Sequence, residues 1–230
     1  MIFKQLFDEQ SSTYTYLLGN EKTGNCVIID PVLECFDRDL ALLHQYQWSL
    51  QWVLETHIHA DHITSASRLK KETGAKVGLG VATQVAQADR LFEENDRLEF
   101  DGISLEVRMT PGHTSGCVSY CSHDRIFTGD ALLIQGCGRT DFQEGNAHTL
   151  FHSVREKIFS LPDETLVFPA HDYQGRTSST IGDQKRNNPR LKLENSESEF
   201  VEIMKKLKLP LPKKIQIAVP ANLNLGEESK

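Results

Sequence analysis

The spacing of hydrophobic positions predicts that the chain opens with strands and then enters a helix. Short alternating or apolar runs over Ile2 to Phe7, Thr13 to Leu18 and Cys26 to Ile29 are typical of strands. The third run ends at Asp30-Pro31, which is a turn signal. Hydrophobic residues then recur at helical spacing over Phe36 to Tyr46. These patterns predict the strands of a first sheet, followed by a helix.

The rest of the chain continues to alternate between strand-like and helix-like spacing of hydrophobic residues. Further strands are predicted over Trp52 to Glu55, Lys76 to Leu79, Arg97 to Phe100, Ile103 to Met109, Cys117 to Cys121, Arg125 to Thr128 and Thr165 to Phe168. Further helices are predicted over Ile63 to Thr73, Thr83 to Phe92, Ala147 to Phe159 and Glu194 to Leu207. Asp101-Gly102 is a strong signal for a hairpin between two of these strands. The pattern predicts an α/β fold in which strands and helices interleave, with helices clustered between two sets of strands.

The size of the chain indicates one domain. A chain of 230 residues with 39% hydrophobic residues can bury a sizeable core. There is no internal repeat and no low-complexity linker, so we expect a single domain over residues 1–230. Residues 192–230 are expected to form a short C-terminal appendage packed on that domain, and Gly226 to Lys230 to be a frayed tail.

Charge and cysteine content exclude some classes of function and indicate the cellular compartment. The net charge is -7 and the basic residues form only short clusters, which argues against binding to nucleic acid or to an anionic membrane. The N-terminus enters a strand pattern at once and resembles no targeting leader. Five cysteines without paired CxxC spacing favour reduced thiols over a disulfide framework. We therefore expect a cytoplasmic protein that acts on a small molecule.

The most informative segment follows the strand predicted to end at Glu55. It contains His57, His59, Asp61 and His62, so three imidazoles and a carboxylate lie within six positions. A single histidine in a polar loop is usually only solvated, but this density favours a metal site because a cation joins groups that otherwise repel or lose hydration.

Three later segments have the same character. His113, Asp130 and His171 each lie in a turn directly after a predicted strand, with glycine or proline close by. Such residues allow the backbone to bend and present a side chain at the rim of a sheet. Together with the first segment, these residues are expected to converge on one site.

This order of residues resembles the metallo-β-lactamase superfamily over essentially residues 1–180. The resemblance implies an αββα sandwich with two mixed sheets between helices. In the two-metal form of that superfamily, one metal position would correspond to His57, His59 and His113. The second would correspond to Asp61, His62 and His171, with Asp130 as a possible bridge between the metals.

A narrower resemblance involves three further motifs, which are Gly136-Cys137-Gly138-Arg139-Thr140-Asp141-Phe142, Asn187-Asn188-Pro189-Arg190-Leu191 and Val219-Pro220-Ala221-Asn222-Leu223. These resemble the persulfide dioxygenases, also called sulfur dioxygenases, that are related to the ethylmalonic encephalopathy protein. The resemblance implies one Fe(II) per chain, held by His57, His113 and Asp130. His59, Asp61, His62 and His171 would then orient the ligands or handle protons rather than bind metal. Ligand chemistry alone does not choose this arrangement over two zinc ions, because imidazole suits both metals.

The same family resemblance implies a reaction in which glutathione persulfide, O₂ and water give sulfite and glutathione, as part of sulfide and sulfane sulfur metabolism. Glutathione carries two carboxylates, so its pocket needs cationic partners. Arg139 and Tyr173 are the expected substrate contacts, and Asp141 and Arg176 are further candidates. His171 or Tyr173 is a candidate proton donor. Arg139 and Asp141 can equally form a local ion pair that holds the loop.

Several alternatives stay open. A glyoxalase II-like hydrolase of glutathione thioesters would use all seven ligands and two metals, either zinc or a mixed pair. The Arg139-Thr140-Asp141-Phe142 segment and the short chain after residue 180 argue against it. A module that binds metal and glutathione without turnover is a third possibility. Cys137 is either a reactive thiol or a packed hydrophobic residue. The family resemblance also suggests a homodimer.

Overall fold

Two six-stranded sheets form the centre of the computed structural model, which describes residues 1–227. The first sheet has its strands in chain order, namely β1 (Ile2–Asp8), β2 (Thr13–Gly19), β3 (Asn25–Ile29), β4 (Ser49–Leu54), β5 (Lys76–Gly80) and β6 (Arg90–Phe92). The strands from β1 to β3 pair antiparallel, and those from β3 to β6 pair parallel. The sheet is therefore mixed, as the family resemblance implied.

The second sheet runs in the reverse order from its far edge. Its strands are β7 (Arg97–Phe100), β8 (Ile103–Met109), β9 (Val118–Cys121), β10 (Arg125–Gly129), β11 (Leu166–Pro169) and β12 (Ser179–Thr180). Only β10 and β11 pair in parallel. The predicted hairpin is confirmed, because β7 and β8 pair across Asp101 and Gly102.

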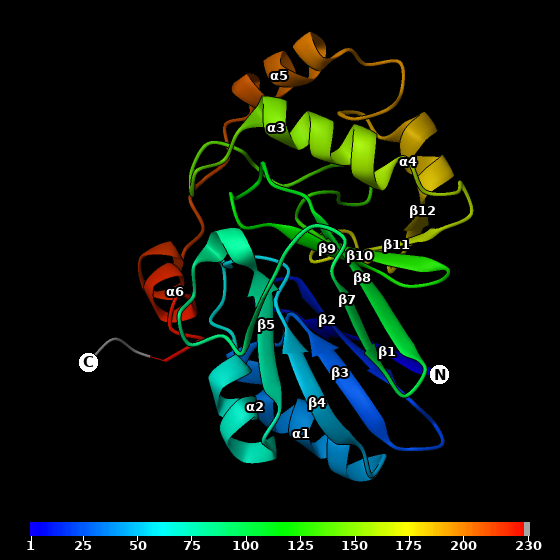
Figure 1. The fold of residues 1–230 in the computed structure, drawn as a ribbon. Coiled ribbons are helices and arrows are strands. Elements are labelled where there is room, and N and C mark those ends of the chain that lie inside the picture. The colour runs from blue at the N-terminus through cyan, green and yellow to red at the C-terminus, as the bar shows by residue number, and fades with distance from the viewer. Residues whose placement is uncertain (228–230) are drawn as a thin grey trace.

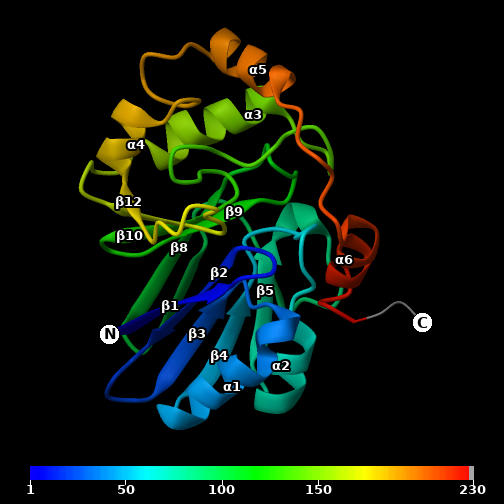
Figure 2. The ribbon, with the colours of Figure 1, turned by 180° about the vertical axis from the view of Figure 1, so that it is seen from behind.

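Helices cover the outer faces of both sheets, except that the last helix lies at the side of the sandwich (Figure 1). They are α1 (Phe36–Gln45), α2 (Ala66–Thr73), α3 (Ala147–His152), α4 (Ile181–Asn187), α5 (Glu197–Lys206) and α6 (Ile215–Asn222). Figure 1 shows α1 and α2 at one end of the molecule and α3, α4 and α5 at the other, and Figure 2 shows the same layers from behind. The predicted αββα sandwich is confirmed. None of the helices in residues 1–227 is long and apolar enough to span a bilayer.

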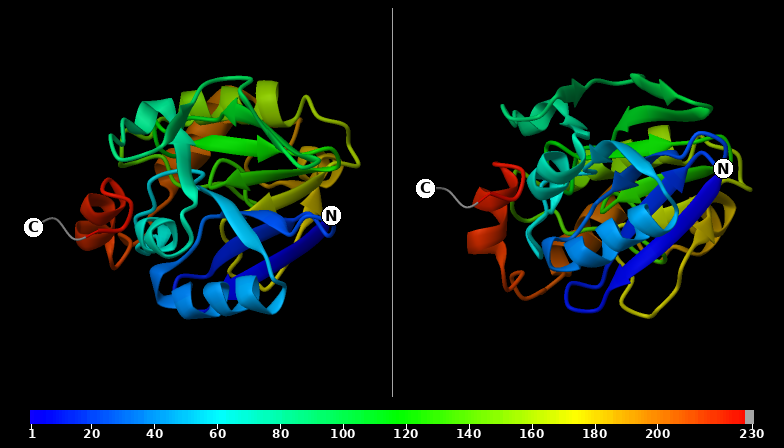
Figure 3. Two further views of the ribbon diagram at one scale, coloured as in Figure 1. Left: turned by 60° about the horizontal axis from the view of Figure 1, so that its bottom comes forward. Right: turned by 90° about the horizontal axis from the view of Figure 1, so that it is seen from below.

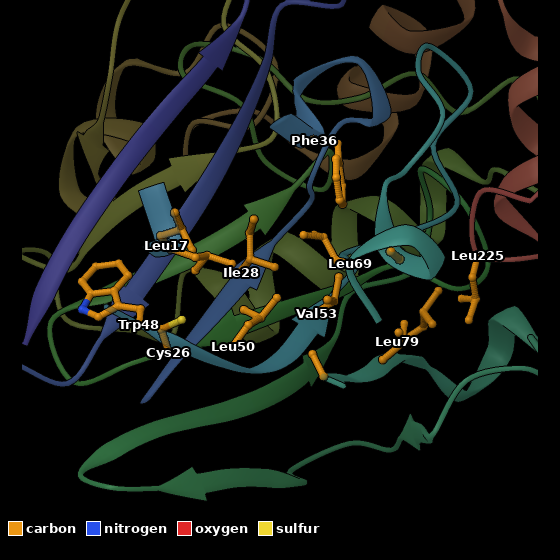
Figure 4. Close-up of a cluster of buried hydrophobic side chains, with 14 of the residues drawn as sticks. Leu17, Cys26, Ile28, Phe36, Trp48, Leu50, Val53, Leu69, Leu79 and Leu225 are labelled. Carbon is orange, nitrogen blue, oxygen red and sulfur yellow. The ribbon is translucent and has the colours of Figure 1, made fainter. Parts of the chain in front are cut away.

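Alternating side chains explain why the central strands are buried on both faces. Leu17 and Ile28 face α1 and α2, and Figure 4 shows them in one cluster with Leu69. Their neighbours Leu18 and Val27 face the second sheet instead. A third cluster, between the second sheet and α3 and α5, includes Ile126, Val167, Leu150, Val154, Phe200 and Met204. The C-terminal part of the chain therefore contributes to the core.

Two sequence predictions need correction. The helix predicted over Thr83 to Phe92 is wrong, because the chain forms a short 3₁₀ turn at Val81–Thr83 and then β6. Gln84 adopts the left-handed region, which interrupts a helix, and β6 instead completes the hydrogen bonds of β5. The helix predicted over Ala147 to Phe159 is α3 continued by a π-helical segment over Ser153–Ile158.

Besides β6 and the short 3₁₀ turns, the sequence did not predict β12, α4 or α6. The short α4 has few hydrophobic residues, and α6 contains Pro220, which is unfavourable inside a helix. Of the predicted tail, Gly226 and Glu227 continue from α6, and residues 228–230 lie outside the described part of the chain.

Asp39 on α1 provides a stability test away from the site. The side chain is fully buried beside Arg38, and burial raises its pKa to about 6 although Arg38 lowers it. The folded state therefore holds a proton that the unfolded state loses near pH 4, so stability is lost as the pH rises from about 4 to about 6. Relative to wild type, the Asp39→Asn protein should gain about 3 kcal/mol in the free energy of unfolding at neutral pH and little at about pH 4. Urea unfolding measures the difference, and an equal gain at both pH values would contradict the assignment.

Candidate metal centre

The predicted metal residues lie in loops that directly follow four strands. His57 comes after β4, His113 after β8, Asp130 after β10 and His171 after β11. These strands belong to both sheets, so the loops meet at one rim of the sandwich. Gly129 makes the turn before Asp130 with φ 53°, and a β-carbon there would lie 2.6 Å from Thr56 Oγ1. The sequence interpretation of glycine at this turn therefore agrees with the backbone.

Three of the converging side chains form a compact group. Ligand atoms of His57, His113 and Asp130 all lie within 4.8 Å of one another. His113 Nδ1 donates to the carbonyl oxygen of Arg139 at 2.7 Å, so its Nε2 faces the group and lies 3.5 Å from Asp130 Oδ2. His57 Nδ1 contacts Thr56 Oγ1 at 2.9 Å. Both imidazoles are thus oriented by a second partner, as metal-binding histidines usually are.

The remaining candidates form a second group beside the first. Ligand atoms of His59, Asp61 and His62 also lie within 4.8 Å of one another. His171 lies between the groups, because its Nε2 is 3.7 Å from an oxygen of Asp61 and 3.7 Å from an oxygen of Asp130. The seven residues predicted from sequence are therefore all brought together, and their positions alone do not distinguish one metal from two.

Two buried carboxylates behind the site hold His59. Its Nε2 lies 3.2 Å from Asp30 Oδ1 and 3.4 Å from Glu55 Oε2. Asp30 adopts a left-handed φ of 51° and accepts hydrogen bonds from the backbone and hydroxyl of Thr56. Such backbone strain in a non-glycine residue is typical of functional sites. Sequence analysis did not identify Asp30 or Glu55 as site residues, although Glu55 lies just before the metal segment and Asp30 directly follows β3.

Burial and neighbouring charges set the protonation of these groups in the metal-free protein. Burial, reinforced by His59 and His113, holds the pKa of His57 well below its ordinary value, which favours the neutral ligand form. Burial opposes the charge on Asp61, yet His171 and His62 hold its pKa well below the usual range. Burial also opposes the charge on His171, but Asp130 and Asp61 raise its pKa. A neutral imidazole and an ionised carboxylate are the forms that bind metal.

The donor set fits a divalent metal. Three buried atoms at the site, His59 Nδ1, His62 Nε2 and Asp130 Oδ1, have no hydrogen-bond partner within the described residues. Buried polar atoms are rarely left without a partner unless an ion or water satisfies them. Imidazole nitrogens with carboxylate oxygens suit Fe(II) and Zn²⁺ alike.

A cavity of about 350 Å³ opens onto the first group. Its lining includes His57, His113, Asp130, Tyr173, Arg139 and Arg176, and also Arg190, Gln174, Phe142 and Leu209. A β-carbon on Gly138, in the loop that forms one wall, would lie 2.7 Å from His113 Nδ1. Glycine at this position therefore allows the cavity wall to contact the imidazole closely. The volume is in the range of small-molecule sites.

The predicted substrate residues differ in whether their side chains already have partners within the protein. Arg139 forms a two-pronged ion pair with Asp141, with both distances 2.6 Å, and donates to the carbonyl of Pro210. Asp141 is absent from the cavity lining in the described chain, so its place fits the local ion pair. Arg176 pairs with Asp172 and donates to the carbonyl of Ile134. Tyr173 is 73% exposed and stacks its ring against His171.

Arg190 is a cavity residue that sequence analysis did not select. Its Nη1 donates to the carbonyl of Cys137 at 2.8 Å, and it forms no ion pair with any described residue. Arg190 belongs to the Asn-Asn-Pro-Arg-Leu motif that contributed to the family resemblance. Nothing in the sequence showed that its side chain reaches the cavity. Cys137 is 3% exposed, and burial raises the pKa of its thiol to about 11, which favours the packed interpretation.

Two mixed sheets between helices, with a histidine and carboxylate cluster at one rim, define a metal-binding protein of the metallo-β-lactamase fold. The family model for the metallo-beta-lactamase superfamily matches residues 9–171.

Closer relatives narrow the family. Persulfide dioxygenase ETHE1, mitochondrial, from Bos taurus is 48% identical over 98% of this chain and 89% of its own length. The same protein from Homo sapiens is 47% identical over 100% of this chain and 90% of its own length. The crystal structure of ETHE1 from Myxococcus xanthus has a TM-score of 0.96 and 49% identity, and the match covers 99% of this chain and 100% of that one. The chain therefore belongs to the persulfide dioxygenase ETHE1 family, a family of oxidoreductases, and the predicted resemblance is confirmed.

Proposed function

We propose that the chain catalyses the iron-dependent oxidation of glutathione persulfide by O₂. The balanced reaction is GSSH + O₂ + H₂O → GSH + SO₃²⁻ + 2 H⁺. The observation that carries the proposal is the group formed by His57, His113 and Asp130 at the floor of the cavity. Two histidines and one carboxylate are the ligand set of many Fe(II) oxygenases. We infer one Fe(II) per chain from this set and from the family.

The side chains around the group suggest how the chain supports the reaction. When bound, Fe(II) would supply the redox chemistry with O₂ that amino-acid side chains lack. The cavity would hold the persulfide sulfur next to His57, His113 and Asp130, and its arginines would bind the glutathione carboxylates. We assign this role to Arg139 and Arg190, and more loosely to Arg176. Tyr173 would be a further hydrogen-bonding contact in the cavity, and Asp141 would act only by holding Arg139 through their ion pair.

Proton transfer is the second role of the chain. His171 or Tyr173 is the proposed proton donor, because their rings stack at the cavity and His171 lies close to Asp61 and Asp130. His59, Asp61 and His62 would orient the loop that carries His57. Dimerisation and a cytoplasmic location stay predictions; five free cysteines support a reducing compartment.

A glyoxalase II-like hydrolase with zinc or a mixed metal pair is the second candidate. The observation that favours it is the complete second group of His59, Asp61 and His62, in which His59 Nδ1 and His62 Nε2 lack partners within residues 1–227. Two metals would satisfy both nitrogens and activate a bridging hydroxide.

Substrate assays separate the two candidates. Iron-loaded protein given glutathione persulfide should consume O₂ and release sulfite in equal amounts. Its kcat/KM for hydrolysis of S-lactoylglutathione should be at least about 100-fold lower than its kcat/KM for persulfide oxidation, a discrimination of about 2.7 kcal/mol. Zinc-loaded protein serves as the control and should consume no O₂, because Zn²⁺ has no redox chemistry. Rapid thioester hydrolysis without O₂ uptake would move the assignment to the hydrolase.

A further inference from the structure

Asn222 is a buried side chain whose hydrogen bonds all go to the first metal loop. It is 2% exposed and lies at the end of α6. Its Nδ2 donates to the carbonyl oxygens of His59 at 2.8 Å and His62 at 2.9 Å. Its Oδ1 accepts from the backbone amide of Thr64 at 2.9 Å. One amide thus fixes three backbone groups of the segment that begins at His57.

The helix that carries Asn222 stands apart from the two helical layers. Figures 1 and 3 show α6 at the side of the sandwich, next to the segments that follow β4 and β5. Within α6 the buried residues are only Ala218, Ala221 and Asn222. Just beyond it, Leu225 joins the core cluster of α2 and the first sheet, as Figure 4 shows. The α6 segment is therefore attached to the domain at two places, the core of the first sheet through Leu225 and the metal loop through Asn222.

The contact continues through the buried polar groups behind the site. Thr64 hydrogen-bonds Glu55 through its hydroxyl, and Glu55 in turn faces His59. Asp30 contacts His59 and accepts from Thr56, whose hydroxyl meets His57 Nδ1. A continuous chain of polar contacts thus connects Asn222 with His57, one of the proposed ligands.

We propose that Asn222 is a positioning residue that holds the His57 to His62 loop in the conformation that retains the metal. The amide does not face the cavity and touches no reacting group, so it acts through the loop backbone. Residues that orient metal ligands from outside typically change metal affinity by about 10 to 100-fold. The inference rests on the metal site of the proposed function, but not on iron or on persulfide chemistry.

Release of Co(II) to an excess of chelator tests the proposal. The Asn222→Asp protein keeps the size of the side chain but replaces the donor amide with oxygens that repel the two carbonyls. We expect it to release Co(II) at least about tenfold faster than wild type. The matched control is Asn195→Asp, since Asn195 Nδ2 also donates to two carbonyls, those of Pro189 and Arg190, far along the chain from the loop. The control should lose stability without faster release.

Thermal unfolding of both metal-free variants separates loop positioning from general stability. Equal release rates for the two variants at comparable unfolding temperatures would overturn the proposal. If Asn222→Asp does not fold, hydrogen exchange in the wild-type protein decides. Coupling between two sites is reciprocal, so if the Asn222 contacts favour metal binding, bound metal must stabilise those contacts. Co(II) should slow exchange of the Thr64 amide and of α6 by about tenfold, a coupling in the usual range. Unchanged exchange would overturn the proposal, whether or not the protein oxidises persulfides.

Discussion

The His113→Ala protein is expected to lose its iron, and its persulfide-dependent O₂ uptake should therefore fall by at least about 100-fold. This loss exceeds the effect typical of removing a residue that only orients a metal ligand. The imidazole is 6% exposed and held by one hydrogen bond from Nδ1 to the Arg139 carbonyl, which leaves Nε2 for the metal. Alanine removes one of the three proposed ligands, together with the imidazole that lies against Gly138. Iron content per chain and O₂ uptake should fall together.

The matched control is His148→Ala. His148 is exposed on α3, pairs with Glu197 and is not among the residues that line the cavity. It should keep wild-type iron content and O₂ uptake. One result would refute the ligand assignment: a His113→Ala protein that retains one iron per chain and oxidises glutathione persulfide at the wild-type rate. Wild-type protein that saturates at two irons per chain would refute the single-iron proposal separately.

The layered fold was predictable because its strands have strong local signals. The runs around Leu17 and Ile28 are apolar on both faces, as strands between a helical layer and a second sheet must be. The end of the helix predicted over Ile63 to Thr73 was also predictable, because the next residue, Gly74, is of the type that most readily adopts the left-handed conformation that ends α2. Where the prediction was wrong, over Thr83 to Phe92, the sheet edge of β5 outweighed helical spacing in a short segment.

The candidate site also contains residues that the sequence predicted and residues that only the fold revealed. His57, His59, Asp61 and His62 were found because ligand spacing within one loop is visible in the sequence. Asn222 lies 160 residues from His62, and its two amide contacts with this loop depend on how α6 folds back. Arg190 likewise needs the fold to reach the carbonyl of Cys137, 53 residues earlier. Contacts at such separations leave no periodicity or spacing in the chain.

Arg190→Gln is expected to raise KM for glutathione persulfide by about tenfold or more while kcat changes little. Arg139 and Arg176 already pair with Asp141 and Asp172, but Arg190 has no carboxylate partner among residues 1–227. A carboxylate of the substrate would provide that partner, and a charge-assisted hydrogen bond contributes about 1.5–3 kcal/mol, which is about a tenfold to hundredfold change in affinity. Binding that is equal in the ground and transition states appears in KM alone.

The glutamine in this variant can still donate to the Cys137 carbonyl, so the cavity wall should keep its shape. Arg186→Gln is the matched control, because Arg186 is exposed on α4 and pairs with Asp163 outside the cavity lining. A second comparison uses a persulfide without carboxylates, for which Arg190→Gln and wild type should have equal KM. If both persulfides bind worse, or if kcat falls with KM unchanged, Arg190 supports the cavity wall rather than the substrate, and the carboxylate must bind elsewhere.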